Sequence, residues 1–212
     1  MTRSEAFNID TLVLKFESCA DKLEKTGDVD LILFGDGLKE MRKVFDNMGD
    51  TFAFAFKDLD DKIETLAIHS GKYPTAGGML DNEVARGSKP PKDSILDGQG
   101  PVSPARAINR STHVCMFITK ILEELEKDKS ATMKTACSNA YEPTLCTIHG
   151  WFVRNSVRLA FNMLPDRVMF MHNCNMTEQD LAEKGPRFVK ASMRLTQHMK
   201  SHFDKRSLNW VF

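Results

Sequence analysis

Apolar residues recur at helical spacing along most of the chain, and this periodicity limits the possible folds more than any other feature. From Thr51 to Ile68, one stripe contains Phe52, Ala55, Phe56, Leu59, Ile63 and Leu66. Similar stripes predict helices at about 9–25, 29–48, 104–127, 131–147, 151–164 and 177–204, and a short one within "GGMLDNEVAR". No window alternates polar and apolar residues as a half-buried strand would. The sequence therefore predicts an all-α fold with long helices packed in layers.

Residues 87–104, "GSKPPKDSILDGQGPVSP", contain four prolines and three glycines and predict one long loop. Ser103 followed by Pro104 is typical of a helix start, and Thr177 with Asp180 resembles a capping pair. The helices on both sides of the loop are too amphipathic to be stable alone. We therefore expect residues 1–212 to form a single domain.

Charge, cysteine content and hydropathy argue against a nucleic-acid-binding, a disulfide-bonded or a membrane-spanning protein. Lysine plus arginine and aspartate plus glutamate each number 29, so no general attraction to nucleic acid is expected. The five cysteines are odd in number and show no C-x-x-C spacing, which favours reduced thiols in a cytoplasmic protein. The N-terminus shows no signal peptide, and no apolar run approaches the ~20 residues that span a bilayer. Any contact with membranes would be peripheral.

Arg106 and Arg110 raise the question of an anion site. Four residues apart on a helix, they share one face with His113 and Phe117, beside an aliphatic stripe. One interpretation is two solvated arginines above a core phenylalanine. The other is a phosphate site, because guanidinium groups bind phosphate in bidentate geometry. An apolar slot past Phe117 would then receive a lipid tail.

Asp58 and Lys62 lie one helical turn apart at the edge of the Phe52–Leu66 stripe. They are either a surface ion pair or the polar rim of an apolar cavity. In the helix that follows His149-Gly150, Trp151, Arg154 and Arg158 share one face, and Val153, Val157, Ala160 and Leu164 share another that should be core. A tryptophan among arginines suits a membrane interface, although a partly buried indole with solvated arginines fits the spacing equally well.

His198 and His202 also lie four apart on a helix. Zinc would need a third ligand, and the sequence places no Cys, Asp or Glu to supply one, so we expect a surface pair and no metal. Motifs of P-loop proteins, zinc proteases and serine hydrolases are absent. We expect no cofactor and no enzymatic activity.

Taken together, these motifs resemble the glycolipid transfer protein superfamily. The matching elements are Asp58-x-x-x-Lys62 after a Phe-rich approach, Arg106-x-x-x-Arg110, His149-Gly-Trp151, "LAFNMLP" at 159–165 and "YPTAGGMLDNEV". The resemblance extends from about Val29 to Pro165 and implies a two-layer α-helical sandwich that encloses one sphingolipid.

The resemblance also implies residue roles. Asp58 matches the aspartate that binds the ceramide amide and hydroxyl, and His149 matches the histidine that binds the amide carbonyl. Glycolipid-specific members have a sugar-stacking tryptophan at the position of Arg110 and an asparagine at that of Lys62. Lys62, Arg106 and Arg110 instead match the cationic triad of the branch that carries ceramide-1-phosphate.

We therefore expect a monomeric, cytoplasmic protein that carries ceramide-1-phosphate between membranes. The tail pocket is expected to contain Phe52, Phe56, Phe117, Ile121, Leu145 and Val153, and transient membrane docking is assigned to Trp151, Arg154 and Arg158. The alternatives are a lipid sensor or scaffold with the same pocket, a glycolipid carrier, and a helical interaction module without ligand.

Overall fold

The structure is a computed structural model that describes residues 6–49, 52–87 and 100–211, and only the backbone of 53–56. The sequence-based expectations for residues 50–51 and 88–99 and for the Phe56 side chain lie outside the described part.

The described part of the chain is built from helices joined by short loops, with no strand, as predicted. Its α-helices are α1 (Ile9–Thr26), α2 (Leu31–Asp46), α3 (Ala53–Ser70), α4 (Ala76–Ala85), α5 (Pro104–Lys127), α6 (Met133–Tyr141), α7 (Trp151–Ala160), α8 (Arg167–Asn173) and α9 (Glu178–Lys205). Two short 3₁₀ helices, η2 (Leu145–Ile148) and η3 (Phe161–Met163), flank α7.

The larger differences from the sequence prediction are three. The helix expected at 151–164 ends at Ala160 and is followed by the 3₁₀ helix η3. The helix expected at 131–147 is divided into α6 and η2, because Pro143 lacks a backbone N–H and disfavours helical geometry in the residue before it. Helix α8 was not predicted, since its seven residues are too few to show a clear period. Asp166 caps it by accepting a 2.8 Å hydrogen bond from the Met169 N–H.

The predicted helix starts are confirmed. Ser103 caps α5 through its hydroxyl, which accepts from the Arg106 N–H at 3.3 Å, and Pro104 occupies the first turn. At α9, Thr177 and Asp180 form a reciprocal capping box with bonds of 2.9 and 3.0 Å. These caps satisfy N–H groups that would otherwise lack partners in the first turn.

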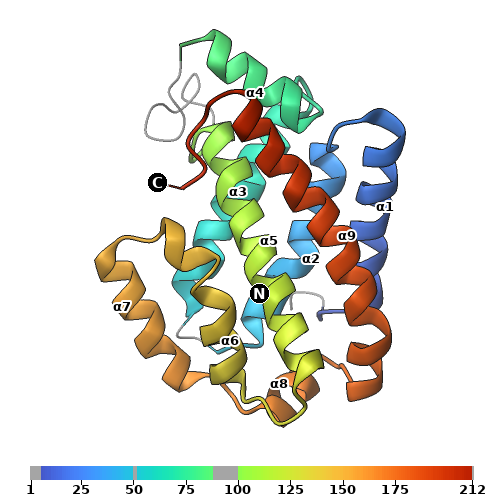
Figure 1. Cartoon of the computed structure of the whole chain (residues 1–212), viewed down its shortest axis with the longest axis vertical. Coiled ribbons are helices and arrows are strands. Elements are labelled where there is room, and N and C mark those ends of the chain that lie inside the picture. Colours follow the sequence, from blue (N-terminus) through green and yellow to red (C-terminus); the bar gives the residue numbers. More distant parts are fainter. Residues whose placement is uncertain (1–5, 50–51, 88–99, 212) are drawn as a thin grey trace.

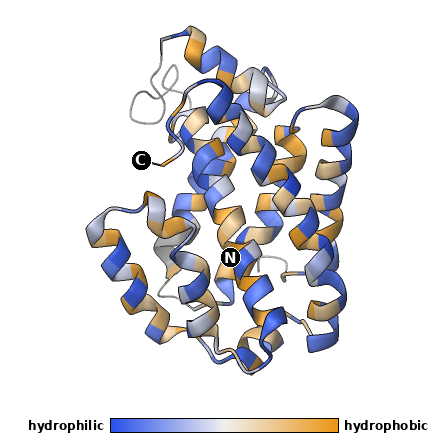
Figure 2. Ribbon diagram, viewed as in Figure 1, coloured by the Kyte–Doolittle hydropathy of each residue, from blue (hydrophilic) through white to orange (hydrophobic). Residues whose placement is uncertain are grey.

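Helix α5 is the centre of the two-layer sandwich. It packs against α3, α6 and α9, while α9 also packs on α1, and α2 lies between α1 and α3. In Figure 1, α5 and α9 run in front of α2 and α3, and α7 lies at the edge far from α1. Figure 2 shows the amphipathic stripes that this arrangement pairs. All five cysteines are buried free thiols, as expected.

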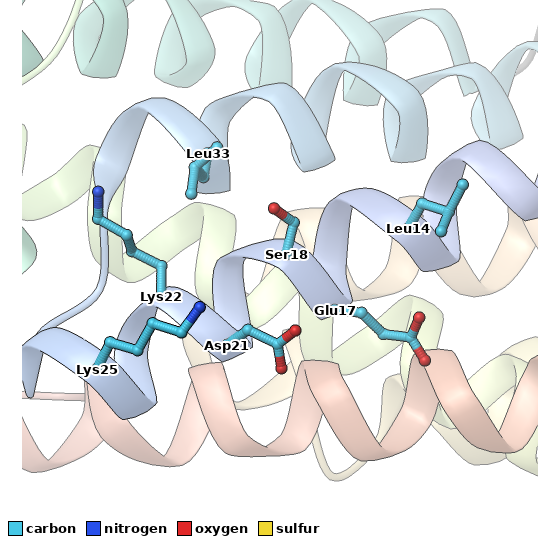
Figure 3. Close-up of a pocket in the computed structure, with 7 residues that line it drawn as sticks. All are labelled: Leu14, Glu17, Ser18, Asp21, Lys22, Lys25 and Leu33. Carbon is cyan, nitrogen blue, oxygen red and sulfur yellow. The ribbon is translucent and has the colours of Figure 1, made fainter.

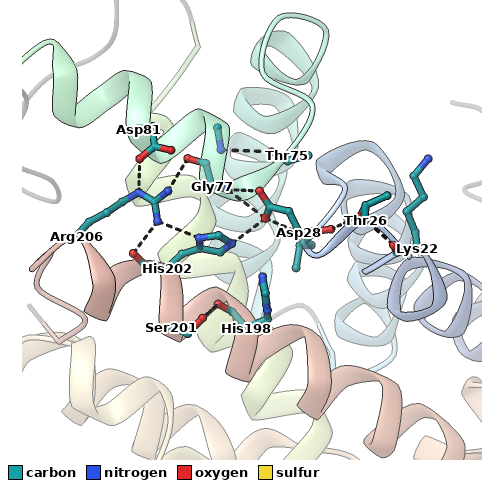
Figure 4. A network of polar contacts seen from close by, with 12 residues as sticks. Lys22, Thr26, Asp28, Thr75, Gly77, Asp81, His198, Ser201, His202 and Arg206 are labelled. Atoms are coloured by element: carbon teal, nitrogen blue, oxygen red, sulfur yellow. Dashed lines mark hydrogen bonds and ion pairs between the residues drawn. The ribbon is translucent and has the colours of Figure 1, made fainter. Parts of the chain in front are cut away.

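A polar network ties the α1–α2 loop, α4 and α9 together (Figure 4). Asp28 accepts from the Gly77 N–H at 3.1 Å and lies 2.8 Å from His202 Nε2. Arg206 donates to His202 Nδ1 at 2.9 Å and to Asp81 at 2.8 Å. A Cβ atom at Gly77 would lie 2.7 Å from both Asp28 and His202, so a larger residue there would displace these side chains.

This network corrects the expectation for His198 and His202. His202 is buried, and Asp28 supplies a carboxylate close to both imidazoles, so the two are not a surface pair. The third group comes from a loop 170 or more residues away in sequence, which spacing alone does not reveal. Because Arg206 can only donate, it leaves the His202 proton on Nε2, facing Asp28. A proton therefore already bridges His202 and Asp28.

Candidate functional site

A pocket of about 510 Å³ opens where α3, α5 and the η2–α7 junction meet. Its polar side contains Asp58, Lys62, Arg106, Arg110 and His149. The apolar wall is formed by Phe45, Val114, Leu145, Ile148 and Val153. The structure thus brings all five sequence-predicted polar residues together.

Lys62 and Asp58 form an ion pair with unequal exposure. The Lys62 side chain is only 4% exposed, whereas that of Asp58 is 62% exposed. Burial lowers the pKa of Lys62, and the adjacent Asp58 carboxylate opposes that shift. The pair is therefore not an ordinary surface contact, because one of its charges has lost most of its hydration.

Arg106 and Arg110 project from successive turns of α5, both half-buried. Arg110 donates from Nη1 to the Ile148 carbonyl at 3.0 Å, which links α5 to η2. Burial and the charge of Arg106 lower the pKa of Arg110 to about 10, so it stays protonated near neutral pH. No described residue forms a side-chain hydrogen bond or ion pair with the Arg106 guanidinium.

His149 completes the polar side between η2 and α7. Its Nδ1 lies 2.8 Å from the Tyr141 hydroxyl. Burial, followed by the charge of Arg110, lowers the pKa of His149 to about 4, so the imidazole is neutral at physiological pH. Three cations and one carboxylate then leave the pocket with a formal excess of two positive charges.

The residues expected to hold a tail are placed in two groups. Leu145 and Val153 line the pocket. Phe52, Phe117 and Ile121 are buried in the core and are not among the pocket-lining residues. Phe52 stacks on Phe161 at a ring distance of 6.2 Å. Two of the six residues expected to hold a tail therefore line the pocket as described, and three belong to the packed core.

Helix α7 exposes more apolar surface than the spacing suggested. Trp151 is 78% exposed and the neighbouring Phe152 is 74% exposed. Further exposed apolar side chains follow on α7, η3 and α8, namely Leu159, Met163, Val168 and Met169. Large exposed apolar side chains on consecutive segments are typical of interaction surfaces. The sequence analysis did not assign Phe152 to the docking surface, because the helical spacing places Trp151, and not Phe152, on the same face as Arg154 and Arg158.

The two arginines of α7 are not equally placed. Arg158 forms a bidentate contact with Glu142, with the shortest distance 2.9 Å. Arg154 is half-buried, and its Nε is enclosed without a described hydrogen-bond partner. Val157 and Ala160 are buried as predicted, Leu164 is half-buried, and Val153 is 38% exposed at the pocket.

Another hollow, on the outer side of α1 and α2, differs in character (Figure 3). It measures about 370 Å³ and is lined by Leu14, Glu17, Ser18, Asp21, Lys22, Lys25 and Leu33. Its charges are mixed, and Arg187 already engages Glu17 at 2.6 Å. It gathers neither buried cations nor an apolar wall, so the α3–α5–α7 pocket remains the candidate site.

The fold and the pocket define an all-α protein with a cation-rich pocket beside an apolar wall. The family model described as glycolipid transfer protein matches residues 29–176, well over half of the sequence. The chain therefore belongs to the glycolipid transfer protein family. No helix in the described part of the chain combines the length and apolarity of a membrane span.

Two groups of relatives stand out. Rat ceramide-1-phosphate transfer protein is 29% identical over 182 residues, which cover 83% of this chain and 82% of the rat protein. The apo-form crystal structure of the mouse ceramide-1-phosphate transfer protein has a TM-score of 0.82 at 24% identity, covering 95% of this chain and 98% of that one. A mutant of Arabidopsis accelerated-cell-death 11, complexed with ceramide-1-phosphate, has a TM-score of 0.88 at 17% identity, covering 99% and 100% of the chains. These structural likenesses show the same fold.

Proposed function

We propose that this protein binds ceramide-1-phosphate and carries it between membranes. The observation that supports this best is the group Lys62, Arg106 and Arg110 around one pocket, where Asp58 is the one carboxylate among the described lining residues. A phosphate monoester carries about −1.5 to −2 charge near neutral pH, which balances the excess of two positive charges. The names of the relatives point to the same lipid.

Each polar residue has a role in this proposal. Lys62, Arg106 and Arg110 bind the phosphate through charge-assisted hydrogen bonds. Asp58 accepts from the ceramide amide and hydroxyl, and neutral His149 donates to the amide carbonyl. Leu145 and Val153 contact the first part of the chains. The lipid tails then extend toward Phe52, Phe117 and Ile121 by displacing core packing.

Transfer requires no covalent chemistry. Each tail CH₂ removed from water contributes about 0.8 kcal/mol, so a carrier that encloses the tail lowers the barrier to crossing the aqueous phase. We propose that the protein docks reversibly on membranes through Trp151 and Phe152, with Arg154 and Arg158 beside them. It acts as a monomer in the cytoplasm.

A competition assay tests the headgroup assignment. Vesicles contain ceramide-1-phosphate and galactosylceramide at equal mole fraction, and transfer of each lipid to acceptor vesicles is measured. We expect preferential transfer of the phosphate lipid, because a neutral sugar cannot balance the excess of two positive charges among the pocket-lining residues. Comparable transfer of both, or preference for the glycolipid, would contradict the assignment. Binding without any transfer would indicate a sensor.

Variants of the triad sharpen the test. One charge-assisted hydrogen bond contributes roughly 1.5–3 kcal/mol, so Arg110→Gln should weaken ceramide-1-phosphate binding by about tenfold or more. Arg106→Leu should act similarly, and the double variant should not be additive because both side chains contact one phosphate. Arg187→Gln, at an exposed arginine paired with Glu17, is the matched control and should bind normally.

A further inference from the structure

Tyr141 lies behind His149 and belongs to no motif that the sequence indicated. It is the last residue of α6 and is completely buried. Its ring meets Phe117 at 6.3 Å and Phe161 at 5.6 Å, both edge to face. These contacts hold the ring so that its hydroxyl lies 2.8 Å from His149 Nδ1.

The position of one proton follows from the contacts of this hydroxyl. Burial raises the pKa of Tyr141, so the phenol keeps its proton at neutral pH. Within the described part of the chain, His149 Nδ1 is its one hydrogen-bond partner. A buried hydroxyl that donates to nothing is costly, and a neutral imidazole has one nitrogen that accepts. Tyr141 therefore donates to Nδ1.

The second ring nitrogen then has a fixed role. Because His149 has a pKa of about 4, its imidazole is neutral and carries a single proton. With Nδ1 accepting from Tyr141, that proton resides on Nε2. His149 lines the pocket while its Nδ1 edge faces buried Tyr141, so Nε2 is the nitrogen left for a ligand.

We propose that Tyr141 is a positioning residue that fixes the tautomer of His149, so that Nε2–H is a permanent donor in the pocket. This inference rests on the proposed function, in which His149 donates to an amide carbonyl. Asp58 accepts a hydrogen bond from the amide N–H and His149 donates one to the amide C=O. Together the two residues recognise a secondary amide. The opposite tautomer would place a lone pair against the carbonyl oxygen and repel it.

The first test needs no lipid. Ring ¹⁵N resonances of His149 in the empty wild-type protein should show a protonated Nε2 and an unprotonated, hydrogen-bonded Nδ1. In Tyr141→Phe, which keeps the ring, the Nδ1 resonance should shift and the second tautomer should become populated. Tyr73→Phe is the matched control, because Tyr73 donates to Asn82 at 2.7 Å away from the pocket. A protonated Nδ1 in the wild type, or an unchanged spectrum in Tyr141→Phe, would overturn the proposal.

The second test separates tautomer control from packing. Loss of one neutral hydrogen bond predicts that Tyr141→Phe binds ceramide-1-phosphate about three- to tenfold more weakly, with no change in Tyr73→Phe. In a His149→Gln background, the amide donor does not depend on a tautomer, so Tyr141→Phe should then have no further effect. An equal loss in both backgrounds would show that Tyr141 acts by packing and overturn its role. If the wild type binds no ceramide-1-phosphate, the proposed function fails while the ¹⁵N result still decides the tautomer.

Discussion

Lys62 carries the buried charge on which the headgroup assignment depends most. Its ammonium is almost fully enclosed, and its partner Asp58 remains largely in water. An exposed carboxylate compensates a buried cation incompletely, which agrees with the lowered pKa of Lys62. A phosphate arriving beside it would supply the missing counter-charge. In this view the buried charge of Lys62 lowers the folding stability of the protein and raises its affinity for the phosphate.

Lys62→Met should separate these two contributions. Removal of the buried charge should leave the free energy of unfolding unchanged or raise it by about 1 kcal/mol, equivalent to a melting temperature roughly 2–4 °C higher. Ceramide-1-phosphate binding should weaken by about tenfold or more. Lys57→Met is the control on the same helix, because Lys57 is 81% exposed. A strongly destabilised Lys62→Met protein would argue that the charge is structural.

Asp28 determines the acid sensitivity of the network that joins α4 and α9. Burial opposes its ionisation, but bonds from His202, Thr75 and the Gly77 N–H lower its pKa to about 2. A carboxyl group with a lowered native pKa stabilises the fold above its unfolded pKa. That contribution is lost as pH falls toward the native value.

Asp28→Asn should therefore change both the stability at neutral pH and its dependence on pH. At neutral pH the variant should be less stable by about 1 kcal/mol, a figure that allows for solvent screening of a half-buried group. Between about pH 4 and 2 it should lose less stability than the wild type. Urea unfolding at several pH values measures both effects, and Asp36→Asn, at an exposed pair with Lys39, is the control. Parallel pH curves for wild type and Asp28→Asn would exclude this account.

At the scale of elements, α7 exposes two adjacent large aromatic side chains at its N-terminus. Trp151 and Phe152 are adjacent in sequence and both exposed, so they cannot occupy one narrow core stripe. Arg158 is already engaged by Glu142. Membrane attraction by α7 should therefore be mainly apolar, with a smaller electrostatic part.

Trp151→Ala tests this docking surface. Burial of one large apolar side chain contributes about 1.5–3 kcal/mol, so partitioning to anionic vesicles should fall about tenfold. The pocket should still bind short-chain ceramide-1-phosphate in solution. Leu14→Ala on α1 is the control, because Leu14 is 60% exposed and helices α1 and α7 lie at opposite edges of the molecule in Figure 1. Unchanged partitioning of Trp151→Ala would show that α7 is not the docking element.

The whole molecule should become more stable when it binds its lipid. A ligand that binds only the native state stabilises it by about 2.7 kcal/mol at 100-fold excess over Kd, or roughly 5–10 °C in melting temperature for this size. Short-chain ceramide-1-phosphate should produce this shift, and galactosylceramide a smaller one. At the same lipid concentration, about tenfold weaker binding by Arg110→Gln should remove about half of the shift or more. A rise that is equal for both lipids would indicate that the tail alone provides binding.

The sequence by itself determined what depends on helical geometry. A helix has 3.6 residues per turn, so the pairs Asp58–Lys62 and Arg106–Arg110 had to share a face wherever the helices lay. The caps at Ser103 and Thr177 are equally local, and both were predicted correctly. The order of these motifs was sufficient to indicate the family, because each is a short continuous segment that can be recognised before the helices are packed.

Only the tertiary structure decided how separate elements meet. Packing buries Lys62 and leaves its partner Asp58 exposed. Contacts between separate segments join Arg110 to the Ile148 carbonyl and Asp28 to His202. Tyr141 and His149 are only eight residues apart, but a helix end and a 3₁₀ turn separate them, so no helical period relates them. Such contacts depend on the direction in which each helix packs, which the spacing within one helix does not specify.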